Sequence, residues 1–183
     1  MLAAVLRAGI GVVQYRAKAG VDHALLARMH ARTARHGALL IVNDDVEAAL
    51  LADGLHAGQE DLAELGFGLR ERLRGRILGI SCAEPRDATA ARALGADYVG
   101  IGPFNATASK GDAGPAIGPA GVEAVVRAVP DLPVVAIGGI GLDDLATVKA
   151  SGAAMAAVIS ALARDGDPDA SARALVERWA ALP

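Results

Sequence analysis

Short apolar runs recur along the chain, and each of them ends in polar residues or glycine. These runs occupy residues 11–16, 38–44, 54–59, 77–81, 98–102, 133–139 and 156–160. The stretches between them carry apolar residues at helical spacing, most clearly at 22–36, 84–94 and 142–150. The runs predict strands and the stretches between them predict helices. Strands that alternate with helices favour a parallel sheet, and therefore an α/β fold.

Three helix-to-strand junctions resemble one another: LLADGLHAG, ALGADYVGIG and ASGAAMAAVIS. Gly95 and Gly152 stand where a helix ends, a position that requires a positive φ which glycine adopts at little cost. A repeated βα unit favours a closed (β/α)₈ TIM barrel over an open sheet. The pattern nevertheless contains seven strands, and the chain opens with a helix, MLAAVLRAG. We therefore expect residues 1–183 to form a single TIM-barrel domain that lacks its first strand, either because the true start lies upstream or because the chain is an incomplete copy.

Composition excludes several classes of protein. A formal net charge of −3 argues against a general nucleic-acid binder or a membrane-surface protein. The single cysteine, Cys82, cannot form an intramolecular disulfide, which favours a cytoplasmic location. We expect Cys82 to be a buried apolar residue rather than a nucleophile. Whether the protein forms a homo-oligomer is left open by the sequence.

Polar residues follow each predicted strand, at the end where a TIM barrel carries its active site. Gln14, Arg16 and Lys18 alternate along the first strand and should share one face, toward the barrel mouth. An inward-facing charge needs an anionic partner. That partner is either a bound ligand or, for Arg16, a salt bridge to Asp44 or Glu60.

Two carboxylates follow the second predicted strand, and Asp61 follows the third. We expect Asp45 to cap the next helix, which leaves Asp44 facing the mouth. One carboxylate from each of two adjacent strands, completed by phosphate oxygens, is a common arrangement for Mg²⁺. Asp44 and Asp61 therefore form a candidate magnesium site, although each could equally serve a helix N-terminus.

The glycines of GGIG follow the sixth predicted strand, and Ser160 ends the seventh. TIM barrels commonly bind phosphate at these two loops through backbone N–H groups, and a plain tight turn is the alternative. His56 lies inside a strand and is expected to be a satisfied core histidine rather than a base. Neither a Ser-His-Asp arrangement nor zinc-ligand spacing is visible. The mouth thus favours chemistry in which a charged leaving group is stabilised electrostatically.

The segment FNATASKGDAG, residues 104–114, connects the fifth predicted strand to a helix that begins near Pro119. A connection of this length within a compact domain is uncommon unless it is a functional lid or is disordered.

Motifs along the whole chain resemble those of the thiamine-phosphate synthases, which are themselves similar to thiazole tautomerases. The matching segments are VQYRAK, LLIVNDDVEAAL, ADGLHAGQEDL, LGISC, GADYVGIGPFNATASKGDAG, VVAIGGI and VISAL. The resemblance implies a (β/α)₈ barrel and a transferase that requires Mg²⁺. Its members join hydroxymethylpyrimidine diphosphate to thiazole phosphate and release pyrophosphate, so the expected partners are small phosphorylated molecules rather than nucleic acid or membrane.

Residue by residue, the resemblance implies three groups of ligands. The pyrimidine diphosphate would contact Gln14, Tyr15, Arg16, Ala17, Lys18, Asn43, Ser81 and Lys110. Asp44 and Asp61 would hold Mg²⁺. The thiazole phosphate would contact Thr107, Ala108, Ser109, Gly139, Ile159 and Ser160. Of these residues, Lys110, Ser81 and Arg16 are expected to take part in catalysis.

The implied reaction passes through a pyrimidine carbocation, and the loop from Thr107 to Lys110 would exclude water from it. The chain departs from the family pattern at Ala17, where an acidic residue is usual, and at Ser109, which replaces a threonine and keeps the hydroxyl. The segment between Asn43 and Asp61 is also slightly shorter than is typical. Two alternatives stay open: a thiazole tautomerase, expected to carry a histidine in place of Ser81, and a non-catalytic phosphate-binding remnant of the barrel.

Overall fold

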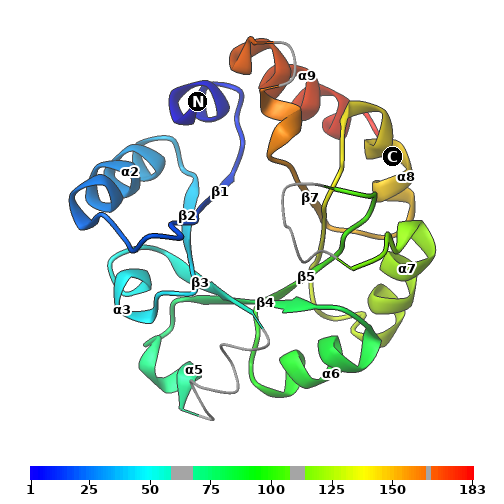
Figure 1. Ribbon diagram of the computed structural model, residues 1–183, viewed down its shortest axis with the longest axis horizontal. Helices are drawn as coiled ribbons and strands as arrows, with labels where there is room; N and C mark the ends of the chain where they lie inside the picture. The colour runs from blue at the N-terminus through cyan, green and yellow to red at the C-terminus, as the bar shows by residue number, and fades with distance from the viewer. Residues whose placement is uncertain (59–67, 108–113, 164–165) are drawn as a thin grey trace.

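The computed structural model describes residues 1–58, 68–107, 114–163 and 166–183. Its centre is one parallel sheet in which every strand pairs with the next strand along the chain. The strands are β1 (Val12–Tyr15), β2 (Leu39–Asn43), β3 (Gly54–Ala57), β4 (Ile77–Cys82), β5 (Tyr98–Ile101), β6 (Val134–Ile137) and β7 (Met155–Ala157). Each of the seven predicted strands is confirmed. Figure 1 shows that the sheet is curled, with its helices on the convex outer side.

The helices follow the strands in alternation. They are α1 (Leu2–Arg7), α2 (His23–Arg35), α3 (Val46–Ala49), α5 (Leu69–Arg72), α6 (Pro85–Ala93), α7 (Gly118–Ala128), α8 (Leu145–Ala150) and α9 (Pro168–Ala180), with 3₁₀ turns η1 (Leu142–Asp144) and η2 (Ser160–Leu162). The helix predicted at 142–150 therefore begins as a 3₁₀ turn. Asp45 accepts a hydrogen bond from the Ala48 N–H, which confirms that it caps α3. Gly95 and Gly152 have φ of 81° and 86°, as predicted for helix ends.

The strand register assigns each side chain to one face of the curled sheet. Gln14 pairs with Ile41, and Asn43 pairs with His56, so these four residues face the concave interior. The alternate residues face the helices and form the larger part of the core. Fully buried members of this outward set are Leu40, Val42, Leu55, Leu78, Ile80, Val99, Ile101 and Ala136. The hydrophobic core thus lies mainly between sheet and helices, which leaves the interior free for polar groups.

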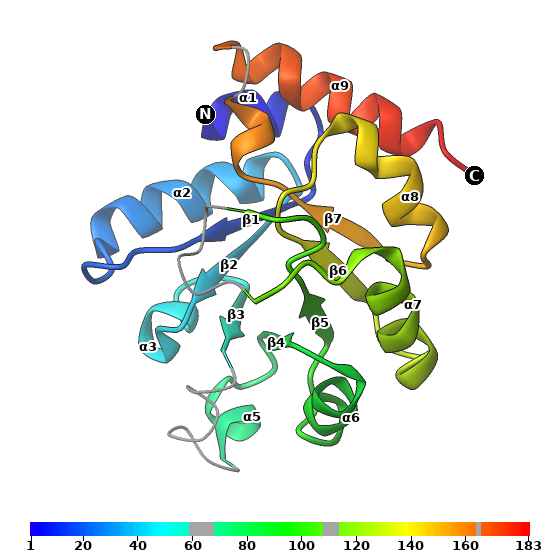
Figure 2. The same cartoon turned by 45° about the vertical axis from the view of Figure 1, so that its right-hand side comes forward.

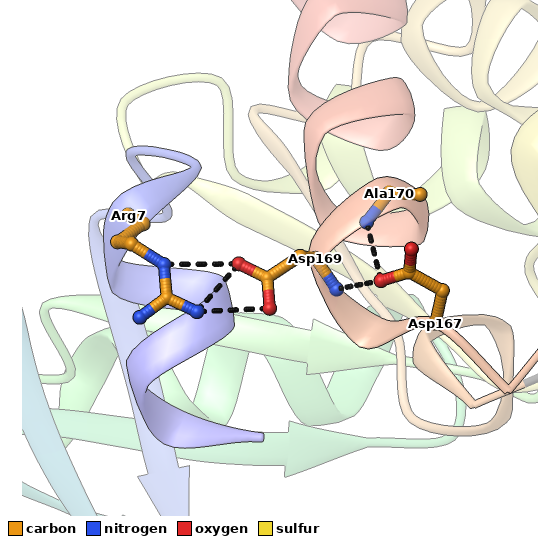
Figure 3. Close-up of polar contacts among 4 residues, drawn as sticks. All are labelled: Arg7, Asp167, Asp169 and Ala170. Atoms are coloured by element: carbon orange, nitrogen blue, oxygen red, sulfur yellow. Dashed lines mark hydrogen bonds and ion pairs between the residues drawn. The ribbon is translucent and has the colours of Figure 1, made fainter.

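The first and last helices of the chain meet on the outside of the sheet, where α1 packs against α9 (Figure 2). Arg7 on α1 donates to both carboxylate oxygens of Asp169, at 2.6 and 2.8 Å, as Figure 3 shows. Asp167 caps α9 by accepting from the N–H groups of Asp169 and Ala170. Because the ion pair is largely exposed, it contributes at most about 1 kcal/mol. The outer layer is nevertheless continuous across this junction.

The inner layer is open at the same junction. Among the described residues, no strand pairs with the free edge of β1 or of β7. Apolar side chains that face the interior near these edges are consequently exposed, including Val12, Leu39 and Ile137. The sheet is thus TIM-barrel-like, but its ring of strands is not closed. This open ring is consistent with the prediction that the first strand of the barrel is missing. In the described part of the chain, no helix is long and apolar enough to cross a membrane.

Candidate functional site

The carboxyl end of β1 presents a row of polar side chains. Gln14, Arg16 and Lys18 are exposed, whereas Tyr15 and Ala17 between them are half-buried. This alternation agrees with the predicted shared face. The Tyr15 hydroxyl accepts a hydrogen bond from the Asp22 N–H at 3.3 Å, which ties the following loop back to the strand. No ion pair of Arg16 is found among the described residues, and Glu60, one of the two alternative partners, lies outside them.

Asn43 ends β2 and is the most distinctive polar residue of the mouth. The residue is only 7% exposed, and its amide nitrogen has no hydrogen-bond partner among the described residues. Leaving a buried donor unpaired costs about 1–3 kcal/mol. A ligand that offers an acceptor at this point would recover that free energy.

Asp44 follows Asn43 in a left-handed conformation, with φ of 66°. Aspartate tolerates this conformation better than most residues. Its N–H donates to the carbonyl oxygen of His56 on β3, and the turn places Asp45 at the start of α3. Asp44 is exposed at the mouth, as predicted, and its carboxylate is a suitable donor for a hard cation. The second predicted ligand, Asp61, lies outside the described residues, and the described residues themselves contain no cluster of three His, Cys, Asp or Glu side chains that could hold a metal ion.

A hydrogen-bonded layer of three side chains crosses the interior of β3, β4 and β5. His56 lies between Tyr98 and Ser81: its Nδ1 is 2.9 Å from the Tyr98 hydroxyl and its Nε2 is 2.9 Å from the Ser81 Oγ. The rings of His56 and Tyr98 also stack, with their centroids 5.5 Å apart. His56 is therefore a satisfied interior histidine, as predicted, but it contacts a candidate site residue directly.

Burial and the nearby charge of Arg16 lower the pKa of His56 from 6.5 to about 4. The imidazole is therefore neutral near pH 7. Burial likewise raises the pKa of Tyr98, which stays a phenol. Burial, followed by the charge of Asp87, raises the pKa of Cys82 to about 12, which supports the prediction that Cys82 is not a nucleophile.

Two glycines make room for this layer. A Cβ on Gly79 would lie 2.0 Å from the Tyr98 ring, and a Cβ on Gly100 would lie 3.2 Å from the His56 ring. Sequence reasoning did not identify Tyr98 as a functional residue. The strand register could have pointed to Tyr98. Gly79 pairs with Tyr98, so large and small residues alternate across neighbouring strands in the interior.

The GGIG segment after β6 is packed against the chain that follows β5. A Cβ on Gly138 would lie 2.7 Å from the Pro103 Cα, and a Cβ on Gly139 would lie 2.8 Å from the Ala106 carbonyl oxygen. Both glycines also have positive φ, 99° and 65°. These contacts explain the glycine pair without a ligand, so the predicted phosphate site stays a prediction.

The same packing fixes the beginning of the long connection. Phe104 is buried, its N–H donates to the Ile137 carbonyl, and Asn105 donates from its side chain to the Gly139 carbonyl at 3.1 Å. Thr107 directly follows this anchored stretch, whereas Ala108, Ser109 and Lys110 lie outside the described residues. Across the sheet, Ile159 follows β7 with 64% of its surface exposed, and Ser160 opens η2.

The described site residues consequently fall into two neighbouring groups. The first lies at the ends of β1, β2 and β4, and contains Gln14, Arg16, Asn43 and Ser81; His56 is hydrogen-bonded to Ser81 and pairs in register with Asn43. The second lies after β5, β6 and β7, and contains Thr107, Gly139, Ile159 and Ser160. The first group offers cations and amide donors, and the second offers hydroxyl and backbone donors. Such a pair of groups can bind two anionic ligands next to each other.

Comparisons with known proteins point in one direction. The profile of a family described as thiamine monophosphate synthase matches residues 1–162. The chain is 42% identical to the thiamine-phosphate synthase of Geobacillus kaustophilus, over 97% of this chain and 83% of that protein. It is 47% identical to a thiamine biosynthesis bifunctional protein of Symbiobacterium thermophilum, over 97% of this chain but only 38% of that longer protein. The solved structure of a thiamine phosphate pyrophosphorylase from Pyrococcus furiosus is 31% identical, with a TM-score of 0.83 over 98% of this chain and 89% of that one.

Proposed function

Because the chain belongs to the thiamine monophosphate synthase family, and is therefore a transferase of thiamine biosynthesis, we propose that it joins hydroxymethylpyrimidine diphosphate to thiazole phosphate and releases pyrophosphate. The observation that carries this proposal is the unpaired, buried amide of Asn43 beside the exposed row of Gln14, Arg16 and Lys18. Cationic and amide donors at one rim suit a multiply charged anion such as a diphosphate ester.

The pyrimidine diphosphate is proposed to occupy the first group of residues. Arg16 and Lys18 would contact its phosphates together with Lys110, and the Asn43 amide would gain the acceptor that it lacks. Ser81 would lie against the pyrimidine ring. The remaining proposed contacts are Gln14, Tyr15 and Ala17. Fixed donors at the diphosphate favour charge that develops as the leaving group departs.

The chemical step is proposed to begin with cleavage of the bond between the pyrimidine methylene carbon and the diphosphate oxygen. The electron pair leaves with pyrophosphate, and the thiazole nitrogen then donates its lone pair to the methylene cation. No proton has to be removed for this bond to form. The described mouth agrees with such chemistry, since its buried histidine already uses both ring nitrogens and is unsuited to act as a base.

Magnesium is proposed as the cofactor, held by Asp44 and Asp61, where it would neutralise charge on the departing pyrophosphate. The exposed carboxylate of Asp44 at the end of β2 fits a hard cation. The thiazole phosphate is proposed to bind beside it, at Thr107, Ala108, Ser109, Gly139, Ile159 and Ser160. The glycine loop and η2 would contribute backbone N–H groups.

We further propose that the described strands belong to a single TIM-barrel domain whose ring an eighth strand would complete between β1 and β7. The unpaired edges and the exposed interior side chains of Val12, Leu39 and Ile137 support this proposal. A cytoplasmic location and small phosphorylated substrates belong to the same proposal. The synthase relatives do not favour the tautomerase or the inert remnant, and Ser81 stands where a tautomerase was expected to carry histidine.

The test is formation of thiamine phosphate from the two substrates with Mg²⁺. It should be run on residues 1–183 and on a longer chain with about twenty upstream residues, roughly a strand and a turn. Product that requires both substrates and the metal would support the proposed reaction. Turnover of neither chain would contradict the reaction, and equal turnover of both would contradict the need for an eighth strand.

A further inference from the structure

The layer formed by Tyr98, His56 and Ser81 does more than fill the interior of the sheet. An apolar set of side chains would fill the same volume without requiring hydrogen bonds. Here instead three polar side chains from β3, β4 and β5 are connected end to end, at 2.9 Å for each contact. Gly79 and Gly100, which have no side chain, leave the space that the two rings occupy. One end of this chain of contacts is the half-buried Tyr98, and the other is the half-buried Ser81 at the mouth.

The direction of the hydrogen bonds follows from counting donors. Tyr98 carries one O–H donor, and within the described residues its only hydrogen-bond partner is the Nδ1 of His56. Leaving that half-buried donor unpaired would cost up to about 1–3 kcal/mol. Tyr98 must therefore donate to Nδ1, so Nδ1 carries no proton. A neutral imidazole then has its proton on Nε2, and this N–H donates to the Ser81 Oγ. The reverse direction, or a protonated imidazole, would leave the Tyr98 O–H without an acceptor.

We propose that Tyr98 and His56 are positioning residues that make Ser81 a hydrogen-bond donor toward the mouth. Because the Oγ already accepts from Nε2, the Ser81 hydroxyl hydrogen is turned away from the sheet and is available to an acceptor atom of the ligand. The ligand feature selected is thus a lone pair, such as that of a heterocyclic nitrogen. The identity of that ligand rests on the proposed function, in which Ser81 lies against the pyrimidine ring. The direction of the hydrogen bonds does not depend on the proposed function.

Histidine tautomers can be measured without any substrate, by long-range ¹H–¹⁵N correlation spectra of the uniformly labelled protein. The resonance of His56 is identified by its loss in the His56→Gln variant. We expect wild-type His56 to be neutral at pH 7.5 with the proton on Nε2, and Tyr98→Phe to lose this single tautomer. A proton on Nδ1 in the wild type, or on both nitrogens, would overturn the proposal. Because it needs no turnover, this result stands even if the chain makes no thiamine phosphate.

Kinetics test whether Tyr98 acts through Ser81. Tyr98→Phe should lower kcat/KM for the pyrimidine substrate about fivefold, the equivalent of one hydrogen bond. In a Ser81→Ala background the same substitution should change kcat/KM by less than about twofold, since the residue to be positioned is gone. Equal losses in both backgrounds would overturn the proposal. Ser151→Ala, which removes a buried hydroxyl bond to the Val148 carbonyl on α8, is the matched control for a stability effect and should leave kcat/KM unchanged.

Discussion

Asn43 offers a test in which stability and ligand affinity should respond differently to one substitution. Its amide nitrogen is buried without a partner among the described residues, and its side chain faces the interior of the sheet next to His56 on β3. Asn43→Leu keeps the number and branching of the side-chain heavy atoms and removes the unpaired donor. The substitution should therefore leave the free energy of unfolding unchanged or raise it by up to about 1 kcal/mol, because a desolvation cost of about 1–3 kcal/mol disappears together with the amide.

Affinity for the pyrimidine diphosphate should fall in the same variant. A hydrogen bond to a charged acceptor contributes about 1.5–3 kcal/mol, which corresponds to a loss of about tenfold to a hundredfold in Kd. Calorimetric titration with the diphosphate and Mg²⁺ measures this loss, and urea unfolding measures the stability. Thr33→Val is the matched control, because the buried Thr33 hydroxyl is satisfied by the His30 carbonyl at 3.0 Å. That control should lose stability by about 1 kcal/mol and keep its affinity.

Two outcomes would refute the reasoning. Destabilisation of Asn43→Leu by more than about 3 kcal/mol, which exceeds the usual cost of a larger side chain, would show that the amide is paired in the folded protein. Unchanged affinity would show that the ligand does not reach the amide. Either result would remove Asn43 from the proposed site.

Three further predictions concern the charged and titratable groups of the mouth. Lys110→Ala should abolish condensation and leave the unfolding curve unchanged; turnover equal to wild type would remove its proposed role. Asp44→Ala should abolish the response to Mg²⁺, and a variant that still responds fully to added metal would contradict that assignment. The folded-state pKa of His56 is lowered to about 4, so the unfolded chain binds the extra proton first as the pH falls. Urea unfolding should therefore show that the stability of the wild type decreases by about 3 kcal/mol between pH 6.5 and pH 4. A stability difference between His56→Gln and the wild type that does not change with pH would refute the lowered pKa.

Much of the fold could be predicted because each element depends on its own residues. The seven apolar runs, the cap at Asp45 and the positive φ of Gly95 and Gly152 follow from local patterns, and all are confirmed. The shared face of Gln14, Arg16 and Lys18 follows from the period of a strand and agrees with the alternating exposure of residues 14–18.

Features that depend on register or on distant packing could not be predicted in this way. The partners of His56 are 25 and 42 residues away, so its hydrogen bonds exist only once β3, β4 and β5 are aligned. The presence of glycine at positions 138 and 139 is likewise explained by packing against a distant segment. Two glycines in a row suggest a ligand loop, but here each makes room for the chain after β5, between Pro103 and Ala106. Whether a glycine faces a ligand or a neighbouring backbone is decided by tertiary structure alone.

The interior glycines show that packing and function in this sheet depend on the same positions. Gly79→Ala would put a methyl group within 2.0 Å of the Tyr98 ring, so the ring would have to move away from His56. His56 would then lose the acceptor role of its Nδ1, and Ser81 would lose the direction of its hydroxyl. A substitution that adds one carbon atom and no charge would thereby change the orientation of the Ser81 hydroxyl, two residues further along β4 at the mouth. Motif matching gives no weight to Gly79 beyond its place in LGISC, yet the polar layer that supports the proposed site cannot form without it.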